Sequence, residues 1–200
     1  THLLDGLDHY TIPAGDDSHP LSVYGIASTE PVQLRDKPTL KPILLLHGRT
    51  WSSVPVYHLM GGPNHQKGKS RSLMEALLEK GLQPYCVDFR GFGGTHLDPS
   101  GYVEPYRCVQ DAETVLSWIG ERHGLAKDDP PALLGWSQGA LVAQLAAQKP
   151  HPSLSKLILY GSIYDPLVRY PREPLYRSTP PDRIVVVNDF DDAMSDFTVE

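Results

Sequence analysis

The sequence has few cysteines, no long apolar run and no excess of positive charge. Two cysteines in 200 residues are too few for a disulfide framework, so we expect Cys86 and Cys108 to be buried free thiols, a state that favours a cytoplasmic location. No apolar run approaches the roughly 18 residues that a membrane span requires. A net charge of −6 argues against nucleic acid or an anionic membrane surface as the main partner.

The rest of the composition is that of an ordinary globular protein. Hydrophobic residues make up 40% and charged residues 21% of the chain, and this length suffices for one domain with a substantial core. Strand and helix patterns extend to about residue 165, whereas residues 166–182 contain five prolines and cannot form an ordinary crossover helix. We therefore expect a core over residues 1–165, and over residues 166–200 the start of a region that folds over the core as a lid or cap.

Short apolar runs alternate with stretches of helical periodicity from Ile43 onward. Two short strands precede this alternation, and the expected elements in chain order are strands 9–14, 21–27 and 43–46, helix 70–80, strand 84–89, helix 104–122, strand 132–134, helix 137–149 and strand 157–160. This order predicts an α/β fold with a mostly parallel, doubly wound sheet and helices on both of its faces. Ligands of such sheets bind at the carboxyl ends of the strands.

The most informative motif is the pentapeptide Gly135-Trp136-Ser137-Gln138-Gly139, which joins a strand to a helix. A serine on so sharp a turn adopts a strained backbone, and the residues two before and two after it must be very small. Glycine occupies both positions. The pattern G-x-S-x-G in this context therefore predicts that Ser137 is exposed at the end of the sheet as a nucleophile.

Two further turns follow neighbouring strands. The segment His47-Gly48-Arg49 follows strand 43–46, and the N–H after Gly48 is a candidate donor to a developing oxyanion, whereas we expect His47 to be a buried hydrogen-bonding residue. The segment Asp88 to Thr95 carries three glycines that permit a tight turn. It is not a phosphate-binding loop, because neither G-x-x-x-x-G-K-[ST] nor G-x-G-x-x-G is present.

The segments HGRTW (47–51), DFRGFGGT (88–95) and GWSQG (135–139), in this order, resemble the α/β-hydrolase superfamily, and most of all its serine esterase-like members. The resemblance covers roughly residues 9–165. It implies that Ser137 is the nucleophile, that the backbone N–H groups of Arg49 and Gln138 form the oxyanion hole, and that no metal or cofactor takes part. Haloalkane dehalogenases and epoxide hydrolases of this superfamily carry Asp at the nucleophile position, so Ser137 argues against both.

The implied function is hydrolysis of a small-molecule ester, lactone, thioester or amide through an acyl-Ser137 intermediate. A catalytically inactive binding or receptor protein with the same fold is the alternative. The segment 54–67 is longer than the family minimum. Five of its residues either line the entrance to the site or belong to a solvated surface loop: Tyr57, His58, Leu59, Met60 and His65.

The sequence departs from the family in its acid and its histidine, which are expected after the serine in that order. The last histidine, His151, lies after the nucleophile helix at the amino-terminal side of the strands and cannot reach Ser137. Asp165, just after the strand 157–160, is a candidate acid. Residues 184–200 are either the beginning of a lid, which we favour, or a further strand at 184–187 followed by an acid among Asp189, Asp191 and Asp192.

A serine without a base is a weak nucleophile, and the expected sheet stops without its closing elements. We therefore expect that the C-terminal strands and the histidine-bearing part are absent from this chain. The missing part is either a second polypeptide from a cleaved precursor, which we favour and which would complete both the sheet and the catalytic triad, or a further stretch of a longer chain.

Overall fold

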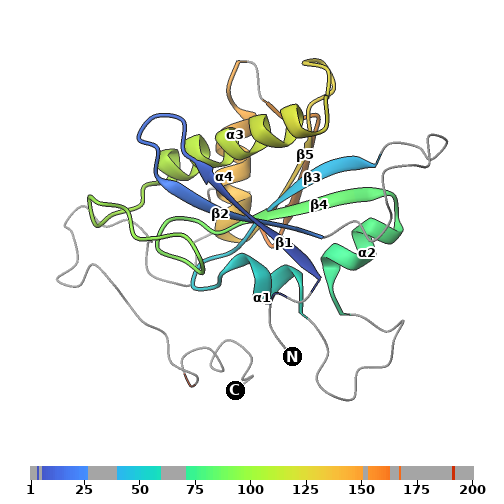
Figure 1. Cartoon of the computed structure of the whole chain (residues 1–200). Helices are drawn as coiled ribbons and strands as arrows, with labels where there is room; N and C mark the ends of the chain where they lie inside the picture. The colour runs from blue at the N-terminus through green and yellow to red at the C-terminus, as the bar shows by residue number, and fades with distance from the viewer. Residues whose placement is uncertain are drawn as a thin grey trace.

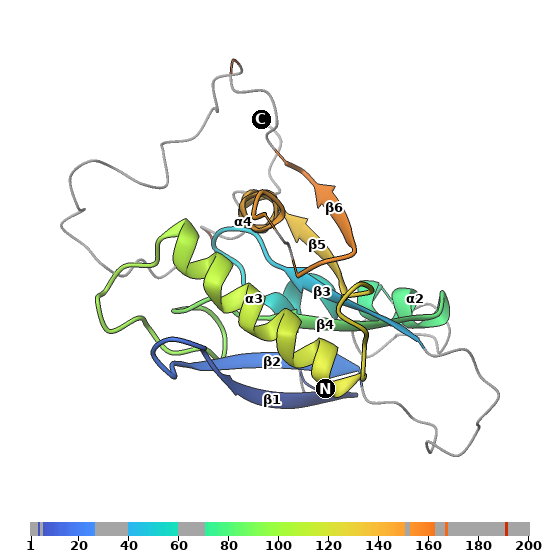
Figure 2. The same cartoon turned by 90° about the horizontal axis from the view of Figure 1, so that it is seen from above.

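The computed structural model describes residues 4, 6–26, 40–59, 71–150, 153–162, 167 and 191. Within these ranges six strands form one sheet (general view in Figure 1) in the order β1-β2-β4-β3-β5-β6, which can be followed in Figure 2. The strands are β1 Leu7–Pro13, β2 Pro20–Ile26, β3 Lys41–Leu46, β4 Leu82–Val87, β5 Ala132–Trp136 and β6 Lys156–Tyr160, and the helices are α1 Ser53–Tyr57, α2 Leu73–Glu79, α3 Pro105–Arg122 and α4 Gln138–Ala147.

The sheet contains both antiparallel and parallel pairs, and the strands that lead to the predicted motifs, β3, β4 and β5, belong to its parallel part. β1 pairs with β2 and β2 with β4 in antiparallel fashion, whereas β3 pairs with β4, β3 with β5 and β5 with β6 in parallel. The prediction of a mostly parallel α/β sheet is confirmed. The carboxyl ends of β3, β4 and β5 therefore lie next to one another, with β3 between the other two.

Helices cover both faces of the sheet. α3 and α4 lie on one face and α1 and α2 on the other, as the two perpendicular views show (Figures 1 and 2). The central strand β3 packs against the helices on both faces, because successive side chains of a strand point to opposite faces. Leu44 and Leu46 pack in the cluster with α3 and α4, whereas Ile43 and Leu45 pack with Met74 of α2.

Helix α1 was not expected from the sequence, because a helix of five residues that includes Pro55 is too short to show a period. The end of this helix and the residue after it bury two of the side chains for which the sequence left open an entrance lining or a solvated surface loop. Tyr57 is 2% exposed and donates a hydrogen bond of 2.7 Å from its hydroxyl to the Leu46 carbonyl oxygen, and His58 is 1% exposed. Both residues are buried, so neither alternative holds for them. Leu59 is exposed, and residues 60–67 lie outside the described residues.

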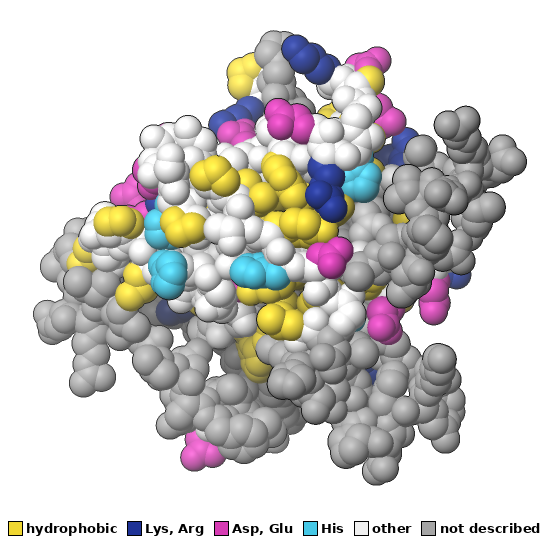
Figure 3. All heavy atoms as spheres, viewed as in Figure 1, with side chains coloured by type: hydrophobic (Ala, Val, Ile, Leu, Met, Phe, Trp, Pro, Cys, Tyr) yellow, Lys and Arg dark blue, Asp and Glu magenta, His cyan; other side chains and the backbone are white. Residues whose placement is uncertain are grey.

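The two edge strands differ in how they are covered. On β1 the Tyr10 ring lies 5.0 Å from the Trp118 ring of α3, and the Arg122 guanidinium carbon lies 4.6 Å from the centre of the Tyr10 ring. Figure 3 shows hydrophobic and histidine side chains on this side of the molecule. The opposite edge is bare in the described part of the chain, because every side chain of β6 is exposed, with Ile158 at 42% and Tyr160 at 67%.

Both cysteines are free and buried, as expected. Burial raises the pKa of the Cys86 thiol to about 12 and that of the Cys108 thiol to about 12, so neither forms a thiolate at neutral pH. None of the helices within the described ranges has the length and apolar character that crossing a membrane requires.

Candidate active site

Ser137 occupies the turn between β5 and α4, as the motif predicts. Its backbone has φ 53° and ψ −114°, a conformation that side-chain-bearing residues rarely adopt. Its N–H donates a hydrogen bond of 3.0 Å to the Tyr160 carbonyl oxygen at the end of β6, and its carbonyl oxygen accepts one from Ala140 N in the first turn of α4. The neighbouring strand and the helix thus hold this strained turn in place.

The glycines on either side of Ser137 are required by close backbone contacts. A Cβ at Gly135 would lie 2.3 Å from the Gly139 carbonyl oxygen, and a Cβ at Gly139 would lie 2.2 Å from the Leu46 carbonyl oxygen. Real Cβ atoms do not approach backbone atoms so closely. The first contact brings the two ends of the turn together, and the second packs the turn against the end of β3.

The turn after β3 lies directly against the serine. A Cβ at Gly48 would lie 3.2 Å from the Ser137 Cβ and 2.9 Å from Cε3 of the Trp136 ring. The ring of Trp136 also faces Gly161 after β6, where an added Cβ would lie 3.4 Å from its Cδ1. The structure therefore brings the two predicted segments, HGR and GWSQG, into contact at one point of the sheet edge.

Two backbone donors adjoin this point. Gln138 is the first residue of α4, so its N–H has no acceptor within the helix. Within the described residues neither the Gln138 N–H nor the Arg49 N–H donates a hydrogen bond. The positive end of the α4 dipole adds to the attraction that such donors exert on an oxyanion. The geometry is thus suited to stabilising negative charge beside Ser137.

His47 is fully buried, as expected, and both of its ring nitrogens are used. The Phe89 N–H donates to Nε2 at 3.0 Å, so the proton is on Nδ1, which donates to the Gly48 carbonyl oxygen at 2.8 Å. Burial lowers the pKa of His47 below its ordinary value of 6.5. The ring is therefore neutral, and it is not free to act as the base for Ser137.

Asp88 joins the turns that follow β3 and β4. One of its carboxylate oxygens accepts hydrogen bonds of 2.7 Å from the N–H and from the hydroxyl of Ser53, and the other accepts one of 2.9 Å from Gly94 N. Gly93 has φ +50°, and a Cβ there would lie 2.0 Å from the carboxylate. The glycine-rich segment is thus a tight turn around the buried Asp88 carboxylate. The turn was expected from the glycines, but the role of the carboxylate was not.

Arg90 ties three distant parts of the chain together. Its guanidinium is 0% exposed and contacts the carboxylates of Asp111 in α3 at 2.7 Å, Asp98 at 2.7 Å and Asp17 of the β1–β2 turn at 2.5 Å. The hydrogen bonds that Arg90 donates to these carboxylates, first of all those to Asp111, raise the pKa of Arg90. Sequence reasoning missed this group, because the partners are separated in the chain and have no shared local pattern.

The acid and the base are not among the groups that surround Ser137 in the described residues. Five of the described histidines make side-chain hydrogen bonds elsewhere: His9 to Ser22, His19 to the His96 carbonyl oxygen, His47 to the Gly48 carbonyl oxygen, His58 to Ser72 and His123 to Tyr85. Asp165 and His151 lie outside the described residues. The structure therefore assigns neither role.

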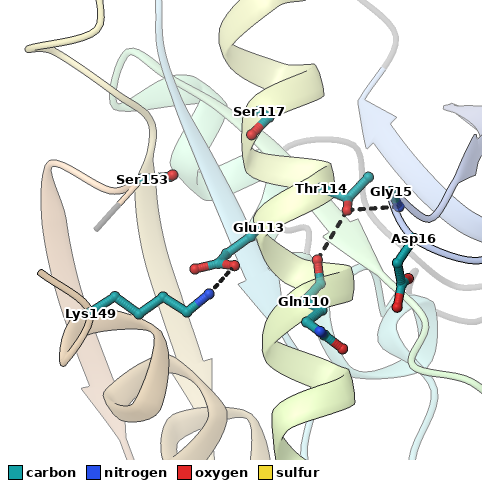
Figure 4. A pocket seen from close by; sticks show the side chains of 8 residues that line it. All are labelled: Gly15, Asp16, Gln110, Glu113, Thr114, Ser117, Lys149 and Ser153. Carbon is teal, nitrogen blue, oxygen red and sulfur yellow. Dashed lines mark hydrogen bonds and ion pairs between the residues drawn. The ribbon is translucent and has the colours of Figure 1, made fainter. Parts of the chain in front are cut away.

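A groove of about 430 Å³ lies on the outer side of α3, between the β1–β2 turn and the residues that follow α4 (Figure 4). Some of its polar groups pair with one another: Lys149 forms an ion pair with Glu113, and Gly15 N donates to the Thr114 hydroxyl. Lys149 follows the C-terminal end of α4, whereas Ser137 precedes its N-terminal end. The groove is therefore separate from the candidate active site.

Comparisons with known proteins agree on the fold. The sequence profile of the alpha/beta hydrolase family matches residues 43–198. An esterase from Pyrococcus furiosus is 21% identical, with a TM-score of 0.52 over 73% of this chain and 48% of the esterase. An epoxide hydrolase from Vigna radiata is 18% identical, with a TM-score of 0.55 over 88% of this chain and 43% of the hydrolase. No curated protein matches the sequence.

A CIB-like hydrolase from Thermoplasma acidophilum is 13% identical, with a TM-score of 0.52 over 76% of this chain. The chain spans 61% of that hydrolase and smaller shares of the esterase and the epoxide hydrolase. At these identities the similarity of structure concerns the fold. The family profile, which covers most of the chain and includes both motifs that meet at Ser137, decides the classification: the chain belongs to the alpha/beta hydrolase family.

Proposed function

We propose that the protein is a serine hydrolase that cleaves an ester, lactone, thioester or amide through an acyl intermediate on Ser137. The observation that carries this proposal is the strained Ser137 turn, which lies against Gly48 beside the unengaged N–H groups of Arg49 and Gln138. Acyl transfer needs a nucleophile within reach of two such donors. The esterase from Pyrococcus furiosus and a thioesterase domain of the curacin biosynthetic pathway share the fold.

In the proposed reaction the Ser137 oxygen attacks the carbonyl carbon of the substrate while a base takes the hydroxyl proton. The carbonyl oxygen becomes an oxyanion, which the Arg49 and Gln138 N–H groups stabilise; loss of one such donor typically costs about 3 kcal/mol of activation free energy. The leaving alcohol, thiol or amine departs with the proton, and the acyl group stays on Ser137. Water then attacks the acyl-enzyme, releases the acid and restores the hydroxyl.

We assign the acid and the base to polypeptide outside the described residues, with Asp165 as the candidate acid and a second chain as the expected source of the histidine. The second chain would also cover β6, where Leu157, Ile158 and Leu159 are 36%, 42% and 39% exposed. Natural domains cover such apolar edges. Native mass spectrometry of the purified protein tests this: we expect a bound second polypeptide, and a monomeric, fully active chain of these 200 residues would contradict it.

A catalytically inactive binding or receptor protein of the same fold is the alternative. The observation that favours it is the absence, among the described residues, of any histidine or carboxylate hydrogen-bonded to Ser137. Such a protein would keep the Ser137 turn, because the close backbone contacts of Gly135 and Gly139 maintain the turn whether or not Ser137 reacts.

Covalent labelling with a fluorophosphonate separates the two functions. We expect labelling of the native protein at Ser137, located by peptide mass spectrometry, and none in Ser137→Ala. Ser117→Ala, on the exposed side of α3, is the matched control and should label like the wild type. Labelling that persists in Ser137→Ala would place the nucleophile elsewhere, and a wild-type protein that does not label would favour the binding protein.

A further inference from the structure

The backbone on both sides of Arg49 is held by side-chain hydrogen bonds. The Nδ1–H of His47 donates to the Gly48 carbonyl oxygen at 2.8 Å, which fixes the peptide group before Arg49. The hydroxyl of Thr50 donates to the Arg49 carbonyl oxygen at 2.5 Å, which fixes the peptide group after it. Neither contact forms part of a helix or a strand. They therefore determine the direction of the Arg49 N–H locally.

The position of the His47 ring indicates that direction. The ring lies on the β4 side of β3, since Phe89 N donates to it and its centre is 4.7 Å from the Phe89 ring and 5.1 Å from the Phe92 ring. The Gly48 carbonyl group points to this ring. In a trans peptide the N–H points opposite to the C=O, so the Arg49 N–H points away from β4. β5, which ends at Ser137, is the strand on that side.

Thr50 shows that the turn is strained. Its φ is 70°, in the left-handed region where a β-branched residue is a clear outlier. Glycine would adopt this conformation without strain, yet the position holds a residue whose hydroxyl reaches the Arg49 carbonyl oxygen. Strain that is kept beside a reactive residue points to a functional requirement.

We propose that His47 and Thr50 are positioning residues that hold the Arg49 N–H toward the oxyanion formed on Ser137. The inference rests on the proposed serine hydrolase function. Neither side chain touches the substrate; both act through the two peptide groups that flank Arg49. The role assigned to Arg49 is that of its backbone N–H, so the direction of this N–H is the quantity that the two side chains control.

Four variants of the complete native protein test the role of Thr50. Thr50→Val removes the hydroxyl and keeps the β-branch, Thr50→Ser keeps the hydroxyl, Thr50→Gly removes both the strain and the hydroxyl, and Thr11→Val is the same exchange at an exposed position of β1. The readouts are kcat and KM for an aryl ester, the rate constant of fluorophosphonate labelling, and Tm.

We expect Thr50→Val to lower kcat and the labelling rate about tenfold, a fraction of the 100-fold or greater effect of removing a donor, with KM unchanged. Thr50→Ser should restore both rates, and Thr11→Val should match the wild type. Thr50→Gly should raise Tm while lowering kcat, a pair of opposite changes that a merely structural role would not produce. His47→Gln should lower kcat further. Because this exchange also removes a buried ring, its effect on kcat is interpreted only together with that of Thr50→Val.

Wild-type rates in both Thr50→Val and Thr50→Gly, with Ser137→Ala inactive, would overturn the positioning role and leave the proposed function intact. Full activity in Ser137→Ala would overturn the proposed function itself. A parallel loss of kcat and Tm in Thr50→Gly would show that Thr50 serves folding only and would also overturn the positioning role.

Discussion

Gly139→Ala is expected to destabilise the protein strongly, although it adds a single methyl group. The new Cβ would lie 2.2 Å from the Leu46 carbonyl oxygen and 2.7 Å from the His47 carbonyl oxygen. Both are backbone atoms of the strand end, so no side chain can rotate away. The first distance has to rise to at least 3.4 Å for an ordinary contact, which separates the Ser137 turn from β3.

Overpacking of this kind costs typically 1–3 kcal/mol, and we expect about 3 kcal/mol here because the clash involves backbone on both sides. A change of about 1 kcal/mol shifts Tm by roughly 2–4 °C for a protein of this size, so Tm should fall by about 6–12 °C. The same shift moves Ser137 away from Gly48, so the rate of fluorophosphonate labelling should fall with it. Circular dichroism during heating and labelling kinetics measure the two effects.

Gly120→Ala is the matched control. Gly120 lies inside α3, and no atom lies within 4 Å of the Cβ that would be added. Alanine favours a helix over glycine by roughly 0.5–1 kcal/mol, so this variant should be slightly more stable than the wild type and label at the same rate. If Gly139→Ala keeps the wild-type Tm and labelling rate, the described contact between the turn and β3 is wrong.

Three further outcomes follow from the site. Hydrogen bonds from Arg90 hold the pKa of Asp17 below its ordinary value of 3.8, so the stability from this pair is present above about pH 4 and is lost as the pH falls; Asp17→Asn should flatten the acid side of a urea-midpoint profile. Burial lowers the pKa of His47 from 6.5, so as the pH falls the unfolded chain binds a proton before the folded chain does, and the free energy of unfolding should decrease below about pH 6.5. His47→Gln should remove this contribution to the pH dependence, and the same pH dependence in the variant as in the wild type would refute it. A Cβ at Gly48 would lie 3.2 Å from the Ser137 Cβ, so Gly48→Ala should slow labelling at least tenfold, and an unaltered rate would show that the turn after β3 plays no part.

The elements that position the site could be predicted because each follows from a local pattern. The apolar run Ile43 to Leu46 reads as a strand buried on both faces, and the structure buries every one of its residues. The G-x-S-x-G spacing predicts the strained turn, since only glycine at positions 135 and 139 avoids contacts of 2.3 Å and 2.2 Å with backbone. The short helix α1 was missed because one turn of helix leaves no period to detect.

The contacts that hold the site could not be predicted, because they join residues far apart in the chain. Arg90 meets Asp17 across 73 positions, and Asp88 meets Ser53 across 35. Nothing in the neighbourhood of either residue specifies its partner. The same holds for His47, whose burial was expected but whose hydrogen bond from Phe89 depends on the parallel pairing of β3 and β4.

The sequence by itself determined the order of the strands and of every described helix except α1, the family resemblance and the identity of the candidate nucleophile, because periodicity and small-residue spacing are properties of single segments. Only the tertiary structure decided that the turns after β3 and β5 touch, that the Gly48 carbonyl group points to a neutral His47, and that Thr50 has a left-handed backbone. These depend on which strands are neighbours in the sheet and on packing between them, and no local pattern of residues contains that information.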